Sequence, residues 1–154
     1  LQTLNLILAA YTDLLERDRI TAALLGDAPA CPPAFALTLH RLWKARQLAG
    51  VDSHIVTLHG ARGARLQDWF EQLLARQRVL DAYWLRPGPD TLHLHMLLPL
   101  GSRLQAEGLL DRLETQLRQW QGTGFDDGPV RARIRAIDAP PAETLRQLQQ
   151  EPVA

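Results

Sequence analysis

Two histidines lie one residue apart in a short apolar segment. Residues 90–99 read DTLHLHMLLP, and this segment contains His93 and His95. Side chains alternate between the two faces of a β-strand, so a strand here would point both imidazoles to the same side, about 7 Å apart along the backbone. Imidazole is a common ligand of divalent transition metals. The spacing therefore predicts a pair of metal ligands, if the segment is a strand and a neighbour supplies a third ligand.

Composition sets broad limits on what the chain can do. Its 154 residues suit a single domain, and a formal net charge of zero gives no general attraction to nucleic acid or membrane. The single cysteine, Cys31, excludes an intrachain disulfide and a cysteine-based zinc site. We find no signal peptide and no apolar run long enough to cross a membrane, so we expect a cytoplasmic location. The chain begins with Leu1, and we expect it to be part of a longer protein.

The elements that must position the histidines follow from periodicity. Helical spacing of apolar residues predicts two N-terminal helices, at 1–25 and from 33 to 50. It predicts three more helices later in the chain, at 64–78, from Ser102 onward, and at 140–150. Alternating, β-branched segments predict strands at 51–59, 79–86, 90–99 and 130–138. Gln105 stands three residues after Ser102, which predicts a capping box at the start of that helix.

The order of these elements after residue 50 is β-α-β-β-α-β, followed by a helix. This order predicts an α+β, ferredoxin-like fold with an antiparallel sheet, in which the first and third strands are central. Both crossover helices should cover one face, and the other face should be open unless the N-terminal helices or a partner cover it. We therefore expect residues 1–50 to form a helical hairpin that packs on or links to a sheet domain at 51–154.

Assigning each strand a phase gathers polar side chains on the open face. The residues predicted there are His59, Asp81, Tyr83, His93, His95, Arg131, Arg133 and Arg135. His93 and His95, with His59 or Asp81 from neighbouring strands, would suit Mn²⁺ or Zn²⁺, and Mg²⁺ less well. The arginine row could hold phosphates, and the Tyr83 ring could stack on a base.

Each of these residues also has a purely structural interpretation. An exposed antiparallel face is normally polar, and charged residues on an edge strand prevent aggregation. Tyr83 could equally pack against an N-terminal helix. If all of these residues have only structural roles, the domain needs no cofactor.

Two short motifs resemble those of the HUH endonucleases, which include rolling-circle replication initiators, relaxases and related bacterial transposases. The segment 92–98, LHLHMLL, is similar to their His-hydrophobe-His motif, and 55–58, IVTL, resembles their first motif. The resemblance covers roughly residues 51–150. It implies a ferredoxin-like sheet, a divalent metal held by His93 and His95 that polarises the scissile phosphate, and single-stranded DNA as a partner.

The nucleophile of that family is missing from its expected place. HUH endonucleases cleave with a tyrosine on a helix, often after the histidine motif, but no tyrosine follows Tyr83 in this chain. Tyr11 could serve only in a rearranged topology. The resemblance therefore leaves three possibilities: binding without cutting, or cleavage by Tyr11, or cleavage by Tyr83. Whether the domain is an enzyme stays open.

Two functions follow from these patterns. The first is a nucleic-acid-binding or nicking domain with a metal site on an open sheet face. The alternative is a non-catalytic regulatory or assembly domain that forms a homodimer or binds a protein partner through its sheet.

Overall fold

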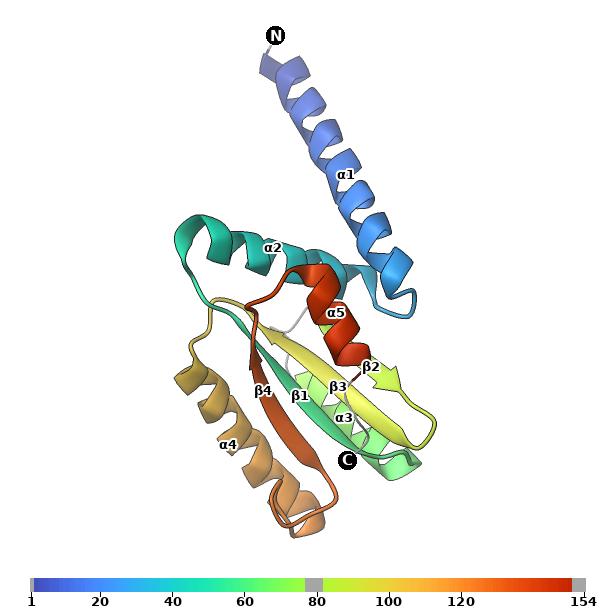
Figure 1. Cartoon of the computed structure of the whole chain (residues 1–154). Helices are drawn as coiled ribbons and strands as arrows, with labels where there is room; N and C mark the ends of the chain where they lie inside the picture. The colour runs from blue at the N-terminus through green and yellow to red at the C-terminus, as the bar shows by residue number, and fades with distance from the viewer. Residues whose placement is uncertain (1, 77–81, 151–154) are drawn as a thin grey trace.

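The computed structural model describes residues 2–76 and 82–150. Its elements, in chain order, are α1 (Gln2–Asp27), α2 (Pro33–Ala49), β1 (His54–Ala61), α3 (Ala64–Arg76), β2 (Tyr83–Pro87), β3 (Thr91–Leu98), α4 (Arg103–Gln121), β4 (Arg131–Ala136) and α5 (Pro141–Gln149). This α+β composition and the order of the elements confirm the prediction from periodicity (Figure 1).

The strands form one antiparallel sheet in the order β2-β3-β1-β4. The first and third strands are therefore central, as predicted. The β1–β3 pairing sets His59 directly opposite His93 and Thr57 opposite His95. On the other side of β1, His59 pairs with Arg131. The sheet thus brings the two predicted histidine segments together.

Helices α3 and α4 cover one face of the sheet. The amphipathic helix α3 buries Leu66, Trp69, Phe70 and Leu73, and α4 buries Ala106, Leu109, Leu113 and Leu117. They pack against strand residues such as Val56 and Leu94, both fully buried. The predicted capping box is present: Gln105 N–H donates to Ser102 Oγ at 3.2 Å, and Ser102 N–H donates to Gln105 Oε1 at 2.9 Å.

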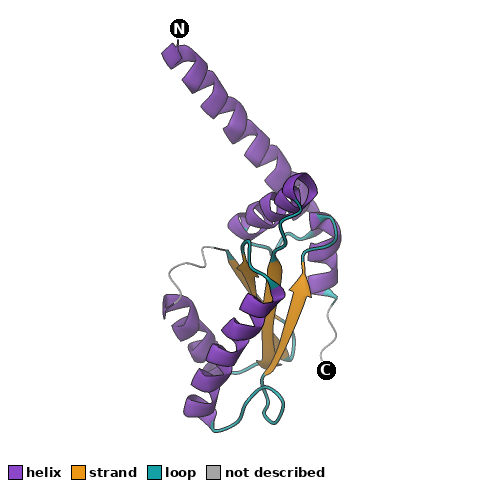
Figure 2. Ribbon diagram, turned by 90° about the vertical axis from the view of Figure 1, so that its left-hand side faces the viewer, coloured by secondary structure: helices purple, strands orange, loops and turns teal. Residues whose placement is uncertain are grey.

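The other face is also covered, which corrects the expectation of an open face. Helices α2 and α5 pack there, so the sheet has helices on both sides (Figure 2). The core between them contains Phe35 and Leu39 from α2, Leu145 and Leu148 from α5, and the strand residues Ile55, Trp84 and Leu97. Apolar strand residues on both faces can be removed from water only by two helical layers. Of the N-terminal helices, α2 is the one that provides this cover.

The phase of β2 differs from the prediction. Tyr83 pairs with Met96, and Trp84 pairs with His95. Trp84 therefore lies on the histidine face with 2% of its surface exposed, whereas Tyr83 lies on the opposite side and is 41% exposed. The predicted phase placed Trp84 toward the only expected core. Because the sheet has a core on each face, an apolar side chain on β2 has apolar neighbours on either face, and hydrophobicity alone does not set the phase.

Helix α1 extends away from the sheet (Figure 1). Its last turns contact the body through Ile20, Leu24 and Leu25, which pack into the core of α2 and α5. Apolar residues nearer its start, including Leu6 and Tyr11, are 71% and 61% exposed. Among the described residues, no helix combines the length and the apolar character that crossing a membrane requires.

Candidate functional site

The three histidines form a stacked row across the two central strands. The ring centroids of His59 and His93 are 5.2 Å apart, and those of His93 and His95 are 5.9 Å apart, with nearly parallel planes in both pairs. His93 is 1% exposed and His95 is completely buried. The structure thus confirms that these side chains share a face, but helices α2 and α5 with their core lie against that face.

Burial keeps the two inner histidines uncharged. Burial lowers the pKa of His93 to about 4, with a further contribution from the neighbouring positive charge of Arg86. Burial, and then Arg86, hold the pKa of His95 well below its usual value. Arg86 Nε donates to His95 Nε2 at 3.4 Å, so Nδ1 of neutral His95 carries the hydrogen and donates to Thr57 Oγ1 at 2.8 Å. These bonds hold His95 as a structural hydrogen-bonding group.

The metal expectation rested on His59, His93, His95 and Asp81. Asp81 lies outside the described residues. Among the described residues, no group of three or more histidine, cysteine, aspartate or glutamate side chains is arranged to hold a metal ion. A histidine nitrogen binds a metal in the plane of its ring, and nearly parallel stacked planes do not converge on one ion. A metal at these positions stays a prediction.

The predicted arginine row lies on the same face, at the sheet edge formed by β4. Its members Arg131, Arg133 and Arg135 pair with His59, Thr57 and Ile55. Arg135 donates to Gln147 Oε1 at 2.5 Å, and Arg131 donates to the carbonyls of Phe125 and Asp126 at 3.3 and 3.2 Å. Across the sheet, Arg86 donates to Leu148 O at 2.8 Å. Arginines therefore tie α5 to both edges of the sheet.

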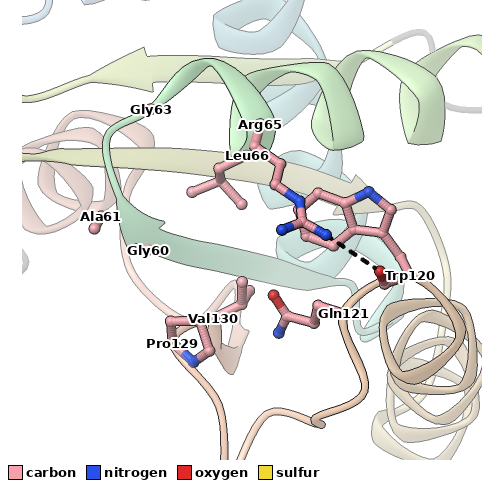
Figure 3. A pocket seen from close by; sticks show the side chains of 9 residues that line it. All are labelled: Gly60, Ala61, Gly63, Arg65, Leu66, Trp120, Gln121, Pro129 and Val130. Atoms are coloured by element: carbon pink, nitrogen blue, oxygen red, sulfur yellow. Dashed lines mark hydrogen bonds between the residues drawn. The ribbon is translucent and has the colours of Figure 1, made fainter.

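Two adjoining pockets lie where β1 ends. The first, with a volume of about 270 Å³, is shown in Figure 3, where the Arg65 guanidinium lies over the Trp120 indole at 4.8 Å. Arg65 also donates to Trp120 O at 3.5 Å. The second pocket has a volume of about 340 Å³ and is lined by His59, Gly60, Ala61, Asp90, Thr91, Gly128, Pro129 and Arg131. Both include Gly60, which stands near the end of β1.

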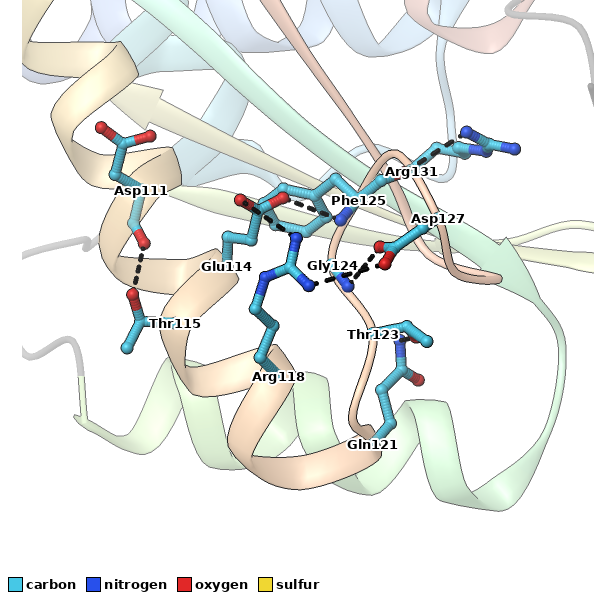
Figure 4. Close-up of polar contacts among 10 residues, drawn as sticks. All are labelled: Asp111, Glu114, Thr115, Arg118, Gln121, Thr123, Gly124, Phe125, Asp127 and Arg131. Atoms are coloured by element: carbon cyan, nitrogen blue, oxygen red, sulfur yellow. Dashed lines mark hydrogen bonds and ion pairs between the residues drawn. The ribbon is translucent and has the colours of Figure 1, made fainter.

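A network of polar contacts holds the loop that forms one wall of these pockets (Figure 4). Glu114 accepts from Phe125 N–H at 2.9 Å, and Asp127 accepts from Gly124 N–H at 2.7 Å. Arg118 lies 3.5 Å from the Asp127 carboxylate. The bond from Gly124 N–H, assisted by Arg118, lowers the pKa of Asp127. The same loop supplies the two carbonyls that fix Arg131.

A third pocket lies at the opposite end of β3. Its volume is about 410 Å³, and it is lined by Leu98, Pro99, Leu100, Gly101, Gln105, Gly108 and Arg112. Two hydrogen bonds hold the turn that forms this pocket. His54, the first residue of β1, donates from Nδ1 to Gly101 O at 2.6 Å, and Oγ of the preceding Ser53 accepts from Leu100 N–H at 2.9 Å. Sequence patterns missed this pocket, since its polar residues are single side chains on an ordinary amphipathic helix.

Arg112 is the cation of this third pocket. It is exposed and forms no hydrogen bond or ion pair with another residue of the described ranges. Tyr83 is on the same side of the sheet, since it pairs with Met96 and the next β3 side chain on that face is Leu98. The Arg112 guanidinium, which has no partner among the described residues, and the half-exposed Tyr83 ring therefore lie at the same end of β3.

Solved structures with the same fold are available for PelD. Over 80% of this chain, the structure of PelD from Pseudomonas aeruginosa PAO1 in complex with c-di-GMP matches with a TM-score of 0.59 and 23% identity. A second PelD structure from the same organism matches 81% of this chain with a TM-score of 0.62 and 21% identity. The aligned region spans 42% and 44% of those two chains, so this chain covers less than half of their length. No curated protein sequence matches the chain.

The family assignment comes from the sequence itself. A family model described as the PelD GGDEF domain matches residues 29–151, from just before α2 to the C-terminal end of the sheet domain. The resemblance to HUH endonucleases was therefore wrong, and with it the expectation of a DNA-binding or nicking domain. The short histidine motif arises from a strand that is buried on both faces. The chain belongs to the PelD GGDEF domain family.

Proposed function

We propose that this chain is a regulatory domain that binds the cyclic dinucleotide c-di-GMP and performs no catalysis. The observation that carries the proposal is membership of the PelD GGDEF domain family, together with the shared fold of PelD in complex with c-di-GMP. This is the regulatory function that the sequence patterns offered as an alternative to DNA binding. We also propose a cytoplasmic location, and we propose to class the sheet with its two crossover helices as ferredoxin-like, on the strength of its strand order.

The chemistry of the ligand specifies what a site must offer. A cyclic dinucleotide has two phosphodiester groups, each with one negative charge, and two guanine bases with flat faces. Guanidinium groups bind phosphate oxygens through paired hydrogen bonds, and aromatic rings stack on bases. A site therefore needs at least one arginine that other carboxylates or carbonyls do not already occupy.

The third pocket, at the end of β3 beside α4, meets these requirements best. Arg112 lines it and has no hydrogen-bonding or ionic partner within the described residues, whereas Arg65 lies over Trp120 and Arg131 is bonded to the loop after α4. Its volume of about 410 Å³ falls within the range typical of ligand pockets, roughly 300–1,000 Å³. Tyr83 at the start of β2 offers a ring at the same end of β3. We assign the phosphate contact to Arg112 and base stacking to Tyr83.

Calorimetric titration of the chain with c-di-GMP tests this proposal. A charge-assisted hydrogen bond contributes about 1.5–3 kcal/mol, so Arg112→Ala should weaken binding by about 10- to 100-fold. Arg103→Ala is the matched control, because Arg103 stands on the same helix and its partner is Glu107 at 3.2 Å. That variant should bind like the wild type.

Two outcomes would contradict different parts of the proposal. If the wild-type chain shows no heat of binding with c-di-GMP at high micromolar concentration, the proposed function is wrong. If Arg112→Ala binds normally and Arg65→Ala does not, the function stands but the ligand occupies the pocket beside Trp120 instead.

A further inference from the structure

The turn between β3 and α4 contains a strained residue. Among the described residues, Leu100 is the only one other than glycine with a left-handed backbone, at a φ of +54°. This conformation brings the Cβ of an L-amino acid close to a carbonyl oxygen, so residues other than glycine adopt it rarely. The Leu100 side chain is also 61% exposed, so its burial does not offset the strain. Strained residues that their surroundings hold in place occur mainly at ligand and catalytic sites.

Contacts on both sides of Leu100 hold the turn in this conformation. Leu100 N–H donates to Ser53 Oγ at 2.9 Å, and the carbonyl of the next residue, Gly101, accepts from His54 Nδ1 at 2.6 Å. Ser53 and His54 are 2% and 6% exposed, so buried side chains make both bonds. At Gly101, a Cβ atom would lie 2.7 Å from Leu98 Cγ, which leaves no room for a side chain. The turn therefore cannot relax around Leu100 without breaking these contacts.

The strained residue lines the third pocket, which also contains Arg112. On the α4 side of this pocket, Gly108 has no atom within 4 Å of the position that a Cβ would take, so there is open space beside the helix. Exposed leucines are common on protein surfaces. Leu104 is an example, because it is 77% exposed and is not among the residues that line this pocket. Leu100 differs from it in combining exposure with backbone strain and a place in the pocket wall.

We propose that Leu100 is a ligand contact in this pocket, and that Ser53 and His54 are positioning residues that hold it there. This inference rests on the proposed binding of c-di-GMP. The flat face of a nucleobase packs against apolar side chains, and the ligand has two bases, so Leu100 adds a base contact to the one assigned to Tyr83. Because the turn already holds Leu100 in place, binding does not have to order it. Packing on a base face does not read the hydrogen-bonding edge, so this contact favours a nucleotide over free phosphate.

Leu100→Gly separates ligand binding from stability. Glycine adopts the left-handed conformation without strain, so this variant should be about as stable as the wild type in thermal denaturation. It lacks the apolar side chain, so it should bind c-di-GMP about tenfold more weakly in a calorimetric titration. Leu100→Asn also tolerates the conformation but is polar, and it should weaken binding in the same way. Leu104→Ala removes an exposed leucine outside the pocket and is the matched control, which should bind like the wild type.

A double-mutant cycle tests the positioning role. Ser53→Ala removes the acceptor of the Leu100 N–H and should weaken c-di-GMP binding. In a chain that already has Leu100→Gly, the same change should have little further effect, because the side chain that Ser53 positions is gone. If Ser53→Ala weakens binding equally in both backgrounds, Ser53 does not act through Leu100.

The remaining outcomes distinguish this inference from the proposed function. If the wild type binds c-di-GMP and both Leu100 variants bind it equally well, Leu100 is not a ligand contact and the proposed function stands. The same conclusion follows if Leu104→Ala weakens binding as much as Leu100→Gly does. If the wild type does not bind c-di-GMP, the proposed function is overturned, and this inference with it.

Discussion

Mild acid should destabilise this fold through His93. Burial lowers the pKa of His93 to about 4 in the folded protein, against an ordinary value of 6.5 that we take for the unfolded chain. Between these two pH values the unfolded chain binds a proton that the folded protein does not bind. The free energy of unfolding therefore decreases as the pH falls from about 6.5 toward about 4.

The size of the effect follows from the two pKa values. At pH 5, the difference in proton binding removes about 2 kcal/mol of stability relative to pH 7, and below pH 4 the loss from this group levels off at about 3 kcal/mol. His95 acts in the same direction, since its pKa is also lowered by burial. Typical domains have a free energy of unfolding of about 5–15 kcal/mol, so the loss is readily measured.

Urea unfolding at pH 7 and pH 5, at constant ionic strength and followed by tryptophan fluorescence, provides the assay. His93→Leu and His93→Gln remove the titrating group, although both also lower stability at pH 7. Between the two pH values, each variant should lose about 2 kcal/mol less than the wild type. If the wild type and both variants lose the same amount, burial of a neutral His93 is not what makes the fold sensitive to acid.

Two more predictions concern stability at neutral pH. Trp84 is 2% exposed, and its ring centroid lies 5.9 Å from that of Phe35, so Trp84→Ala should lower the free energy of unfolding by about 3–5 kcal/mol. Tyr83 is half-exposed, so Tyr83→Ala should lower it by far less. Guanidinium denaturation measures both losses, and equal losses would contradict the observed phase of β2. Ser102→Ala removes the N-terminal cap of α4 and should lower the free energy of unfolding by about 1 kcal/mol, as measured by thermal or chemical denaturation. Arg103→Ala is the control. If Ser102→Ala lowers the stability no more than this control does, the capping box contributes nothing measurable.

Local patterns in the sequence predicted the elements well, because each signal is local. Alternation in Thr91–Leu98, helical spacing in Ala64–Arg76, and the Ser102–Gln105 pair all depend on residues a few positions apart. The order of these elements then limits the connections so strongly that the strand order could be predicted as well. Fold class and strand order therefore needed no tertiary information.

The side chains that matter for function could not be placed in the same way. Ile55, Trp84 and Leu97 are buried because α2 and α5 return to the second face, and this is a property of distant segments. With that face taken as open, His93 and His95 suggested an exposed metal site, whereas in the structure both side chains are buried; a metal there stays a prediction. Arg112 gave no signal at all, because a single arginine on an amphipathic helix looks like any solvated residue.

The hydrogen bonds of α5 have a mechanical consequence. Arg86 on one edge strand reaches the carbonyl of Leu148, and Arg135 on the other edge strand reaches the side chain of Gln147. The C-terminal end of α5 therefore links the two edge strands, β2 and β4, which are not neighbours in the sheet. We therefore expect a shift of either edge strand to act on the opposite edge through α5, as well as through the two central strands to which the edge strands are hydrogen-bonded.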